Sequence, residues 1–485
     1  MERSSPAAIG AASSISPADQ AGPVGAAEAD GVDGTTGADR PPEVGVAAGG
    51  TGAALPGVAH AWAALQGDAA LLERTSCNLR EELLPARLPV LDLARATVAV
   101  CSLAAAELSS VRSGDSSVPA VRLDDGAVAT AFTSERHLRT DGRSPVNFAP
   151  LSRFWRTADG WLRTHANYPH HRTRLLSALG FAQHYHDRTD LSEAVAAELA
   201  QRDAAEVEET VHAAGGLAVA ARTAREWAAH PQGAQAANRP LLSTARLDKA
   251  PPLPLAQPAG QGALHSVRVL DLTRVIAGPV ATRTLALFGA DVLRIDSPQL
   301  PERPDAHADT GPGKRSTLLD LSSRADQATF EELLSAADVV VTGYRPGVLD
   351  RFGLAPESLA DRRPGVIVGQ LSAWGAYGPW RRRRGFDSLV QTASGIAVTE
   401  GQQQRETGSE DDAAPGTLPA QALDHGTGYL LAAAVLRALT EQRLGQCGSR
   451  LVRLSLAQTA NWLQNGLTSL PDNAQATQPA TPGVR

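Results

Sequence analysis

The sequence predicts an α/β protein whose large domain is built on a Rossmann-like parallel sheet, with a smaller α+β domain beside it. Between residues 267 and 397, short apolar strands alternate with helical stretches, which is typical of parallel α/β sheets. The first strand of this region, residues 267–272, is almost continuously apolar, as expected for a strand that helices cover on both faces. We therefore expect it to lie in the centre of the sheet.

The other elements of this region follow in chain order. Gly278 and Pro279 open an apolar helix at 280–288, because proline is tolerated in a first helical turn, and Gly289 is placed to end it. Beyond it we expect strands at 291–296, 338–342 and 366–372 and a helix at 324–337. The first turn contains no G-x-G-x-x-G, so the sequence does not favour nicotinamide or flavin binding.

Five ordered motifs carry a resemblance to a known family. They are DLTRVIAGP, FGADVLRID, GKRS, YRPGVLDRFGL and a GFD that precedes a small-residue helix. In this order and at these spacings they resemble the large domain of the family III CoA-transferases (CaiB/BaiF type), which include formyl-CoA and carnitine CoA-transferases and 2-methylacyl-CoA racemases. The resemblance implies that fold and the transfer of coenzyme A between an acyl-CoA thioester and a carboxylic acid. It also implies a homodimer, with the CoA thioester as substrate and no permanently bound cofactor.

The first 54 residues differ in composition from the rest of the chain. They are rich in Ala, Gly, Pro, Ser and Asp, contain no aromatic residue, and hold seven acidic residues against two basic ones. Such a segment cannot bury enough apolar surface to offset the entropy of ordering, so residues 1–54 are predicted to be disordered. They carry most of the formal net charge of −7, and the near-neutral remainder does not suggest a nucleic-acid partner.

Residues 55–245 are interpreted as a small-domain-like region. Helical stretches are expected at 61–72 and 91–108, followed by a two-stranded signal at 121–132. From Phe154 onward the sequence resembles the small domain of the same family, which normally follows the large domain. The chain is therefore interpreted either as permuted or as a fused pair of family copies of which the first is degenerate.

The remaining boundaries follow from composition. A Pro-rich linker is expected at 246–265, a large domain at 266–470 and a flexible tail at 471–485. No basic stretch followed by an apolar run begins the chain, and the apolar run at 429–436 is too short to span a bilayer. We expect a cytoplasmic protein that does not bind membranes, with 429–436 in a buried helix.

Histidines and cysteines raise the question of a metal site. His165, His170 and His171 lie close together, and His184 and His186 follow. No arrangement with structural-zinc spacing accompanies them, the resemblance implies no metal, and the three cysteines are widely spaced, so we expect no metal site. The alternative is that Pro169 starts a helix over 170–179, with the histidines partly exposed at its first turn.

Asp424 is the candidate catalytic residue. It precedes a long apolar helix, at the place where the resemblance implies the family's catalytic aspartate. An aspartate with an ordinary pKa of about 3.9 is ionised at neutral pH and needs no separate base to attack a thioester carbonyl. Gly426 and Gly428 would let backbone N–H groups approach the developing oxyanion. The alternative interpretation of Asp424 is a helix N-cap, where Asp is among the preferred residues.

Coenzyme A requires cations for its phosphates and apolar walls for its pantetheine and adenine. Taken residue by residue, the resemblance implies CoA contacts from Val275, Ser297, Tyr344, Arg351 and Arg384, with Lys314 and Arg315 of GKRS as neighbouring candidates. Ser297 stands where family members often carry a basic residue, and Gly343 stands where an Asn is usual. The run 381–384 of four arginines is a further candidate for a phosphate rim.

Two alternative functions stay open at this stage. In the racemase branch a His directly precedes the Asp of a GHD motif, and this chain has Phe386 there, which favours transfer over epimerisation. His425 adjoins Asp424, but successive residues at a helix start point in different directions. The second alternative is a relative that binds acyl-CoA without catalysis.

Overall fold

The computed structural model describes residues 50–51, 55–145, 148–181, 190–253, 262–405 and 414–467. The predicted disorder of residues 1–54 and the predicted tail at 471–485 fall outside these residues, except that Gly50–Thr51 form the short strand β1. His184, His186 and much of the predicted linker also lie outside them.

The expected sheet is present and has seven strands in the order β10-β9-β8-β11-β12-β13-β7. The four predicted strands are confirmed as β8 (Arg268–Leu272), β9 (Asp291–Asp296), β11 (Val339–Thr342) and β12 (Ile367–Ser372). The sequence analysis did not identify β10 (Lys314–Leu318), β13 (Arg450–Ser455) and β7 (Ser243–Arg246). Only β7 runs antiparallel to its neighbour, so a strand that precedes the other six in the chain closes one edge of the sheet.

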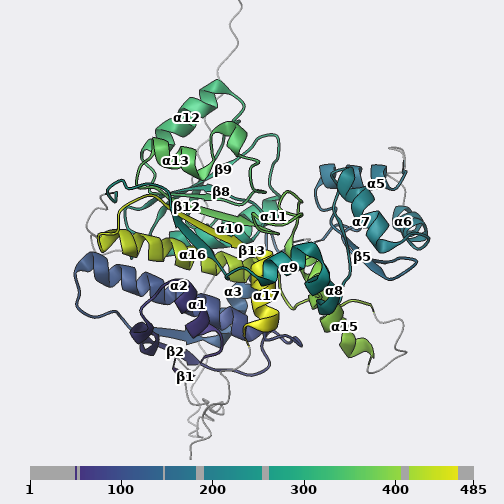
Figure 1. Ribbon diagram of the computed structural model, residues 1–485, viewed down its shortest axis with the longest axis horizontal. Coiled ribbons are helices and arrows are strands. Elements are labelled where there is room, and N and C mark those ends of the chain that lie inside the picture. Colours follow the sequence, from purple (N-terminus) through teal and green to yellow (C-terminus); the bar gives the residue numbers. More distant parts are fainter. Residues whose placement is uncertain are drawn as a thin grey trace, which may run out of the picture. The chain divides into compact units, whose positions relative to one another are not determined.

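Helices cover both faces of this sheet (Figure 1). Those of one face are α10 (Ala277–Leu287) and α16 (Ala422–Arg443), with α2 (Val90–Ser113) packed along α16. Those of the other are α12 (Arg324–Ser335) and α13 (Pro356–Arg362). Alternate residues of β11 divide between the two cores, Val339 and Val341 toward α16 and Val340 toward α12, as the period of two in a strand requires. The predicted helices at 280–288 and 324–337 are thereby confirmed with small shifts at their ends, and the predicted buried helix at 429–436 is confirmed as the middle of the longer α16.

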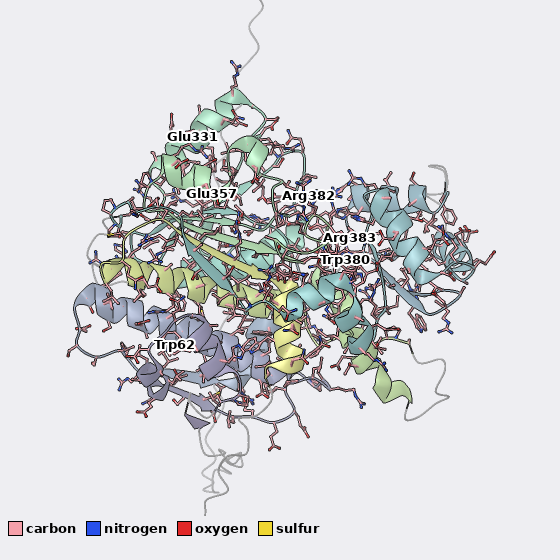
Figure 2. The ribbon with its side chains drawn as sticks, in the orientation of Figure 1. Trp62, Glu331, Glu357, Trp380, Arg382 and Arg383 are labelled. Carbon is pink, nitrogen blue, oxygen red and sulfur yellow. The ribbon has the colours of Figure 1, made fainter. Side chains whose placement is uncertain are left out.

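The first part of the chain packs beneath α16. It comprises α1 (Val58–Ala64), a 3₁₀ helix at Ala69–Arg74, β2 (Thr75–Asn78), α2, β3 (Val121–Asp124), α3 (Asp125–Phe132) and α4 (Ser134–His137). The two-stranded prediction for 121–132 was wrong, because only β3 is a strand. Asp124 caps α3 by accepting hydrogen bonds from Gly126 N and Ala127 N. In Figure 2, Trp62 lies in this layer, and the Arg437 guanidinium of α16 sits 5.6 Å from the centre of its ring.

The next part forms a separate antiparallel sheet with its own apolar cluster. Its strands are β4 (Phe154–Arg156), β5 (Trp161–Thr164) and β6 (Ala218–Ala220), and its helices are α5 (Pro169–Ala178), α6 (Leu191–Leu199) and α7 (Ala204–Ala213). Residues 55–245 therefore contribute to two cores. Their interpretation as one small-domain-like or degenerate copy stays a prediction.

The remaining helices connect these layers. They are α8 (Ala224–Ala229), α9 (Pro231–Ala237), α11 (Pro304–Thr310), a 3₁₀ turn at Asp350–Phe352, α14 (Asp387–Ala393), α15 (Ile396–Arg405) and α17 (Leu456–Asn465). None of the helices in the described ranges is long and apolar enough to cross a bilayer. In Figure 2, Trp380 and Arg383 mark the loop before α14, where Arg383 pairs with Glu209 of α7.

Candidate active site

Asp424 is the third residue of α16, and the helix N-cap is Gln421. The interpretation of Asp424 as the N-cap is therefore wrong. The capping role falls to Asp387, which accepts hydrogen bonds from the backbone N–H groups of Asp424, at 2.9 Å, and Leu423. Because another carboxylate satisfies the helix end, the Asp424 side chain is not needed for it.

The Asp424 carboxylate is buried, with 7% of the residue exposed. In the described part of the chain, no donor forms a hydrogen bond to its side chain, whereas Asp387 accepts three. Burial, followed by repulsion from Asp387 and Glu135, raises the pKa of Asp424 well above its ordinary value. The expectation that Asp424 behaves as an ordinary, fully ionised aspartate is thus not supported.

His425 and Glu135 lie beside Asp424 and contact each other. His425 is fully buried, stacks on Phe132 and places Nε2 3.4 Å from the Glu135 carboxylate. Burial acts to raise the pKa of Glu135, but its contact with His425 brings that pKa below its ordinary value. Glu135 comes from α4, so the first half of the chain supplies part of the charge around Asp424.

Asp424 lies where two cavities meet. The larger, a cleft of about 630 Å³, and the smaller, a cavity of about 140 Å³, share four lining residues. These are Tyr168, Val275, Phe386 and Asp424. A molecule bound in the cleft and a group held in the cavity can therefore both reach the Asp424 carboxylate.

The cleft contains the five residues that the resemblance implied for CoA, namely Val275, Ser297, Tyr344, Arg351 and Arg384. Arg174 and Arg345, which the sequence analysis did not identify, also line it. Burial, together with Arg345 and Arg174, lowers the pKa of Arg384 to about 10, so these three guanidiniums lie close enough to repel one another. Such a cluster of cations favours an anionic ligand.

Val275 has a backbone φ of +72°, in the left-handed region that a β-branched residue rarely adopts. Its N–H donates a 2.9 Å hydrogen bond to the Glu302 carboxylate, which also accepts 2.7 Å from the Tyr168 hydroxyl. Glu302 is buried and lies 3.6 Å from Arg274 and 3.7 Å from Arg294. This carboxylate holds the strained loop at the junction of the two cavities.

The small cavity has an aromatic wall. Phe386 stacks on His165 with ring centroids 3.8 Å apart and planes 3° apart. Burial, reinforced by Arg163, lowers the pKa of His165 to about 3, and burial next to His170 lowers that of His171 to about 2. Both imidazoles are neutral at physiological pH, and neither can serve as a ready proton donor.

Two of the residues predicted to contact CoA, Lys314 and Arg315, lie outside the cleft. The Lys314 ammonium is buried and bonds Asp271 at 3.1 Å and the Thr282 hydroxyl at 2.7 Å, and Arg315 pairs with Asp291 on the exposed sheet edge. Neither residue lines the cleft. Within the arginine run, Arg383 and Arg384 line the cleft; Arg383 pairs with Glu209, whereas Arg384 forms no ion pair in the described ranges and donates a 3.3 Å hydrogen bond to Gly215 O.

Gly426 and Gly428 lie in the second turn of α16, where backbone N–H groups bond within the helix. A Cβ on Gly428 would come within 2.6 Å of the Ala277 carbonyl oxygen of α10, and one on Gly426 would lie 3.4 Å from Leu93 of α2. Their positions fit helix packing and do not present free donors to an oxyanion.

The histidine patch is more buried than expected. The predicted helix after Pro169 is confirmed as α5, but His165 and His171 are buried, and only His170 is partly exposed. Across the residues that the structure describes, no three His, Cys, Asp or Glu side chains gather into a group that could hold a metal ion.

Comparison with known proteins gives the family. A family model described as CoA-transferase family III matches residues 49–248 and 264–484, which is most of the chain. The chain belongs to CoA-transferase family III. The two matched segments of this family III chain are separated by the Pro-rich stretch near residue 255.

Individual relatives match over a smaller part. The chain is 36% identical over 217 residues to the acetyl-coenzyme A transferase nodX of Hypoxylon pulicicidum, covering 44% of this chain and 35% of that protein. It is 32% identical over 201 residues to a formyl-CoA:oxalate CoA-transferase of Rhodopseudomonas palustris, covering 39% and 45%. A crystal structure of the hypothetical protein Rv3272 from Mycobacterium tuberculosis is 30% identical, with a TM-score of 0.38 over 42% of this chain and 58% of that one. The chain thus spans only about a third to a half of the length of the curated relatives it matches.

Proposed function

We propose that this family III protein transfers coenzyme A between an acyl-CoA thioester and a carboxylic acid through a covalent intermediate on Asp424. The observation that carries the proposal is the position of Asp424, which is buried, without a hydrogen-bond donor in the described structure, and at the junction of two cavities. Family membership and the names of relatives that transfer CoA support it.

In the proposed reaction, the Asp424 carboxylate attacks the thioester carbonyl and the C–S bond breaks. CoA leaves as a thiolate, and Asp424 carries the acyl group as a mixed anhydride. The thiolate then attacks the aspartyl carbonyl, which releases the donor acid and leaves CoA on Asp424. The acceptor carboxylate follows the same steps in reverse and departs as the new thioester.

The environment of Asp424 suits this role. A carboxylate that no donor stabilises is more reactive toward a carbonyl than one in water, because no hydrogen bond has to break before the attack. Its raised pKa means that the reactive, ionised fraction grows as the pH rises through that pKa. Loss of the negative charge on forming the anhydride removes its repulsion with Asp387 and Glu135.

The two cavities divide the substrate between them in this proposal. The larger cleft, with Arg174, Arg345, Arg351 and Arg384, takes the phosphates and pantetheine of CoA. The cavity of about 140 Å³ takes the acyl group. A protein cavity of about 150 Å³ holds one benzene molecule, so we propose a short acyl group and not a fatty acyl chain.

The racemase alternative has less support. Racemisation needs a group that removes an α-proton and another that returns it on the opposite face. The position before Asp387 is Phe386, and the two imidazoles that contact Phe386, those of His165 and His171, are neutral and poor proton donors. The homodimer and the cytoplasmic location stay predictions.

The test is a search for the covalent intermediate. The full chain is incubated with acetyl-CoA and with palmitoyl-CoA, trapped with hydroxylamine and digested, and the peptide containing Asp424 is examined by mass spectrometry. We expect a hydroxamate on Asp424 with acetyl-CoA, far less with palmitoyl-CoA and none in Asp424→Asn. No adduct in the wild type, with CoA binding intact, would show a non-catalytic binder. Solvent deuterium at the α-carbon of a recovered thioester would instead support the racemase.

A further inference from the structure

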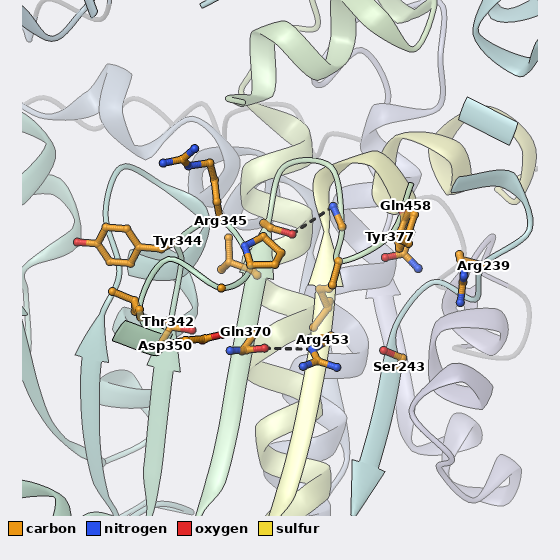
Figure 3. A pocket seen from close by; sticks show the side chains of 18 of the residues that line it. Arg239, Ser243, Thr342, Tyr344, Arg345, Asp350, Gln370, Tyr377, Arg453 and Gln458 are labelled. Carbon is orange, nitrogen blue, oxygen red and sulfur yellow. Dashed lines mark hydrogen bonds between the residues drawn. The ribbon is translucent and has the colours of Figure 1, made fainter. Parts of the chain in front are cut away.

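A third cavity, which Asp424 does not line, opens at the carboxyl ends of β11, β12 and β13 and has a volume of about 340 Å³ (Figure 3). This is within the range of small-molecule pockets. Its floor is a row of polar residues at one register across four adjacent strands, Thr342 of β11, Gln370 of β12, Arg453 of β13 and Ser243 of β7. Figure 3 shows these four side chains in a line across the strands.

The polar row contrasts with the row that precedes it. Two residues earlier on the same face, Val340, Val368 and Leu451 are buried against α12 and α13. Strands of a parallel sheet are normally apolar on both faces, and a polar side chain placed there costs free energy unless it is paired. The change from an apolar to a polar row occurs where the helices stop covering the sheet and the cavity begins.

The charges in this cavity are unbalanced. Arg239, Arg345 and Arg453 line it, and Asp350 is the one acidic residue among its lining residues. Arg453 donates from Nε to Gln370 Oε1 at 3.0 Å, and Arg239 lies over the Tyr377 ring at 5.3 Å. None of the three arginines forms an ion pair with an acidic residue in the described ranges, so the cavity carries excess positive charge.

We propose that this cavity binds a small organic oxyanion, a phosphate or carboxylate group held by Arg453 with help from Arg239. A guanidinium recognises such groups with two parallel hydrogen bonds. Gln370 fixes the Arg453 side chain through Nε and leaves its outer nitrogens for the ligand. Tyr344 and Tyr377, which also line the cavity, offer flat surfaces for the organic part.

The cavity is also a neighbour of the cleft proposed for CoA. Tyr344, Arg345, Leu349, Leu371 and Ser372 line both. The oxyanion can therefore come from two sources, a free small molecule or the 3′-phosphate of a CoA that extends past Tyr344. The site itself does not depend on the chemistry of Asp424.

The experiment measures the thermal midpoint of the full chain in increasing inorganic phosphate at constant ionic strength. A ligand that binds the native state and not the unfolded chain raises the midpoint by an amount that grows with the logarithm of its concentration above the dissociation constant. We expect a rise that Arg453→Gln removes, with phosphate binding at least about tenfold weaker, since a hydrogen bond to a charged group is lost. Arg246→Gln, an exposed arginine of β7 outside the cavity, is the matched control and should keep the full response.

Because phosphate stabilises many proteins by exclusion from their surface, the difference between the two variants decides the matter. Equal responses in Arg453→Gln and Arg246→Gln would overturn the proposal. If Arg453→Gln does not fold, the wild-type protein is modified with phenylglyoxal in the presence and absence of phosphate. We then expect phosphate to protect Arg453 from modification and to leave Arg246 unprotected. An unprotected Arg453 would overturn the proposal equally.

A repeat with saturating CoA and 3′-dephospho-CoA identifies the source. If CoA abolishes the phosphate response and dephospho-CoA does not, the site holds the 3′-phosphate of CoA. If the response survives both, the site takes a free organic anion. Loss of the response with dephospho-CoA as well would place phosphate in the CoA cleft and overturn a separate site.

Discussion

The starts of α14 and α16 place two aspartates side by side in the interior and treat them differently. Asp387, at the start of α14, accepts hydrogen bonds from Gln391 and from the backbone N–H groups of Leu423 and Asp424. Asp424, in the first turn of α16, accepts none within the described structure. The described hydrogen-bond donors thus serve Asp387, which joins the two helices, and leave Asp424, the proposed nucleophile, without one.

Burial acts on both carboxyls, and their surroundings separate them. It raises the pKa of Asp387 to about 6, where the backbone and Gln391 hydrogen bonds limit the shift. Within the described structure no hydrogen bond limits the rise in the pKa of Asp424, and repulsion from Asp387 and Glu135 adds to that rise. At neutral pH Asp387 is therefore the better stabilised anion, and ionising Asp424 acts against the folded state.

The largest predicted effect is a loss of folding stability when Asp387 is replaced, which tests whether Asp387 has the structural role. Asp387→Asn should destabilise the protein by about 1–3 kcal/mol, because the new NH₂ group faces the Gln391 amide and one acceptor is lost from the helix end. Gln391 cannot simply rotate, since its Oε1 accepts from Leu418 N at 3.0 Å. Urea unfolding monitored by circular dichroism measures the change.

Asp424→Asn is the control for that variant and should act in the opposite direction. The folded pKa of Asp424 lies above its unfolded value of about 3.9, so the native state binds the extra proton between the two and wild-type stability falls as the pH rises through this window. Asn cannot ionise and avoids that loss. A destabilised Asp424→Asn at neutral pH would show that Asp424 has a structural role.

A second prediction compares the two glycines behind Asp424. Gly428→Ala should cost about 1–3 kcal/mol, because its Cβ would meet the Ala277 carbonyl oxygen at 2.6 Å and push α10 from α16. Gly426→Ala, whose Cβ would lie 3.4 Å from the Leu93 side chain, at the edge of ordinary van der Waals contact, should be close to neutral or stabilising, since Ala favours helix. Unfolding free energies check both. If Gly426→Ala instead abolished adduct formation without loss of stability, the glycine would be acting in the chemistry.

The smallest predicted effect is a shift in pH dependence. Glu135→Gln removes one of the charges that raise the pKa of Asp424, so the pH at which adduct formation is half-maximal should fall. Single-turnover rates between about pH 4 and 8 measure it, a window that runs upward from the ordinary carboxyl range. Glu135→Asp keeps the charge and serves as the matched variant. A rate change without any shift of the profile would mean that Glu135 acts only through packing against His425.

The sequence predicted four of the seven strands, and apolar character separates them only in part from the others, since β9 (DVLRID) is as polar as β13 (RLVRLS). β8, β9, β11 and β12 are confirmed, whereas β13 carries Arg453 and β7 is a short, exposed strand more than 200 residues earlier in the chain. The two-stranded prediction for 121–132 was wrong because the DDG triplet at 124–126 suits a hairpin turn, whereas in the structure Asp124 caps the helix α3. Local sequence does not distinguish these two uses.

The candidate site shows the same limit. Asp424 and the five cleft residues followed from ordered motifs, each local in sequence. Glu135, Arg174 and Glu302 lie 289, 250 and 122 positions before Asp424, and no spacing rule connects them to it. Lys314 has the residue type expected of a phosphate ligand, but it neutralises the buried Asp271. Only the packing decides which of two partners a lysine serves.

The pairing of α2 with α16 has a consequence for how the protein is made. The buried face of α2 is complete after residue 113, but α16 begins only at residue 422. At roughly 5–20 residues per second, a ribosome needs about 15–60 s to produce the intervening chain. Throughout that time a long apolar helix face has no partner to pack against, so the nascent chain, more than the finished protein, should depend on chaperones and on slow, uninterrupted translation.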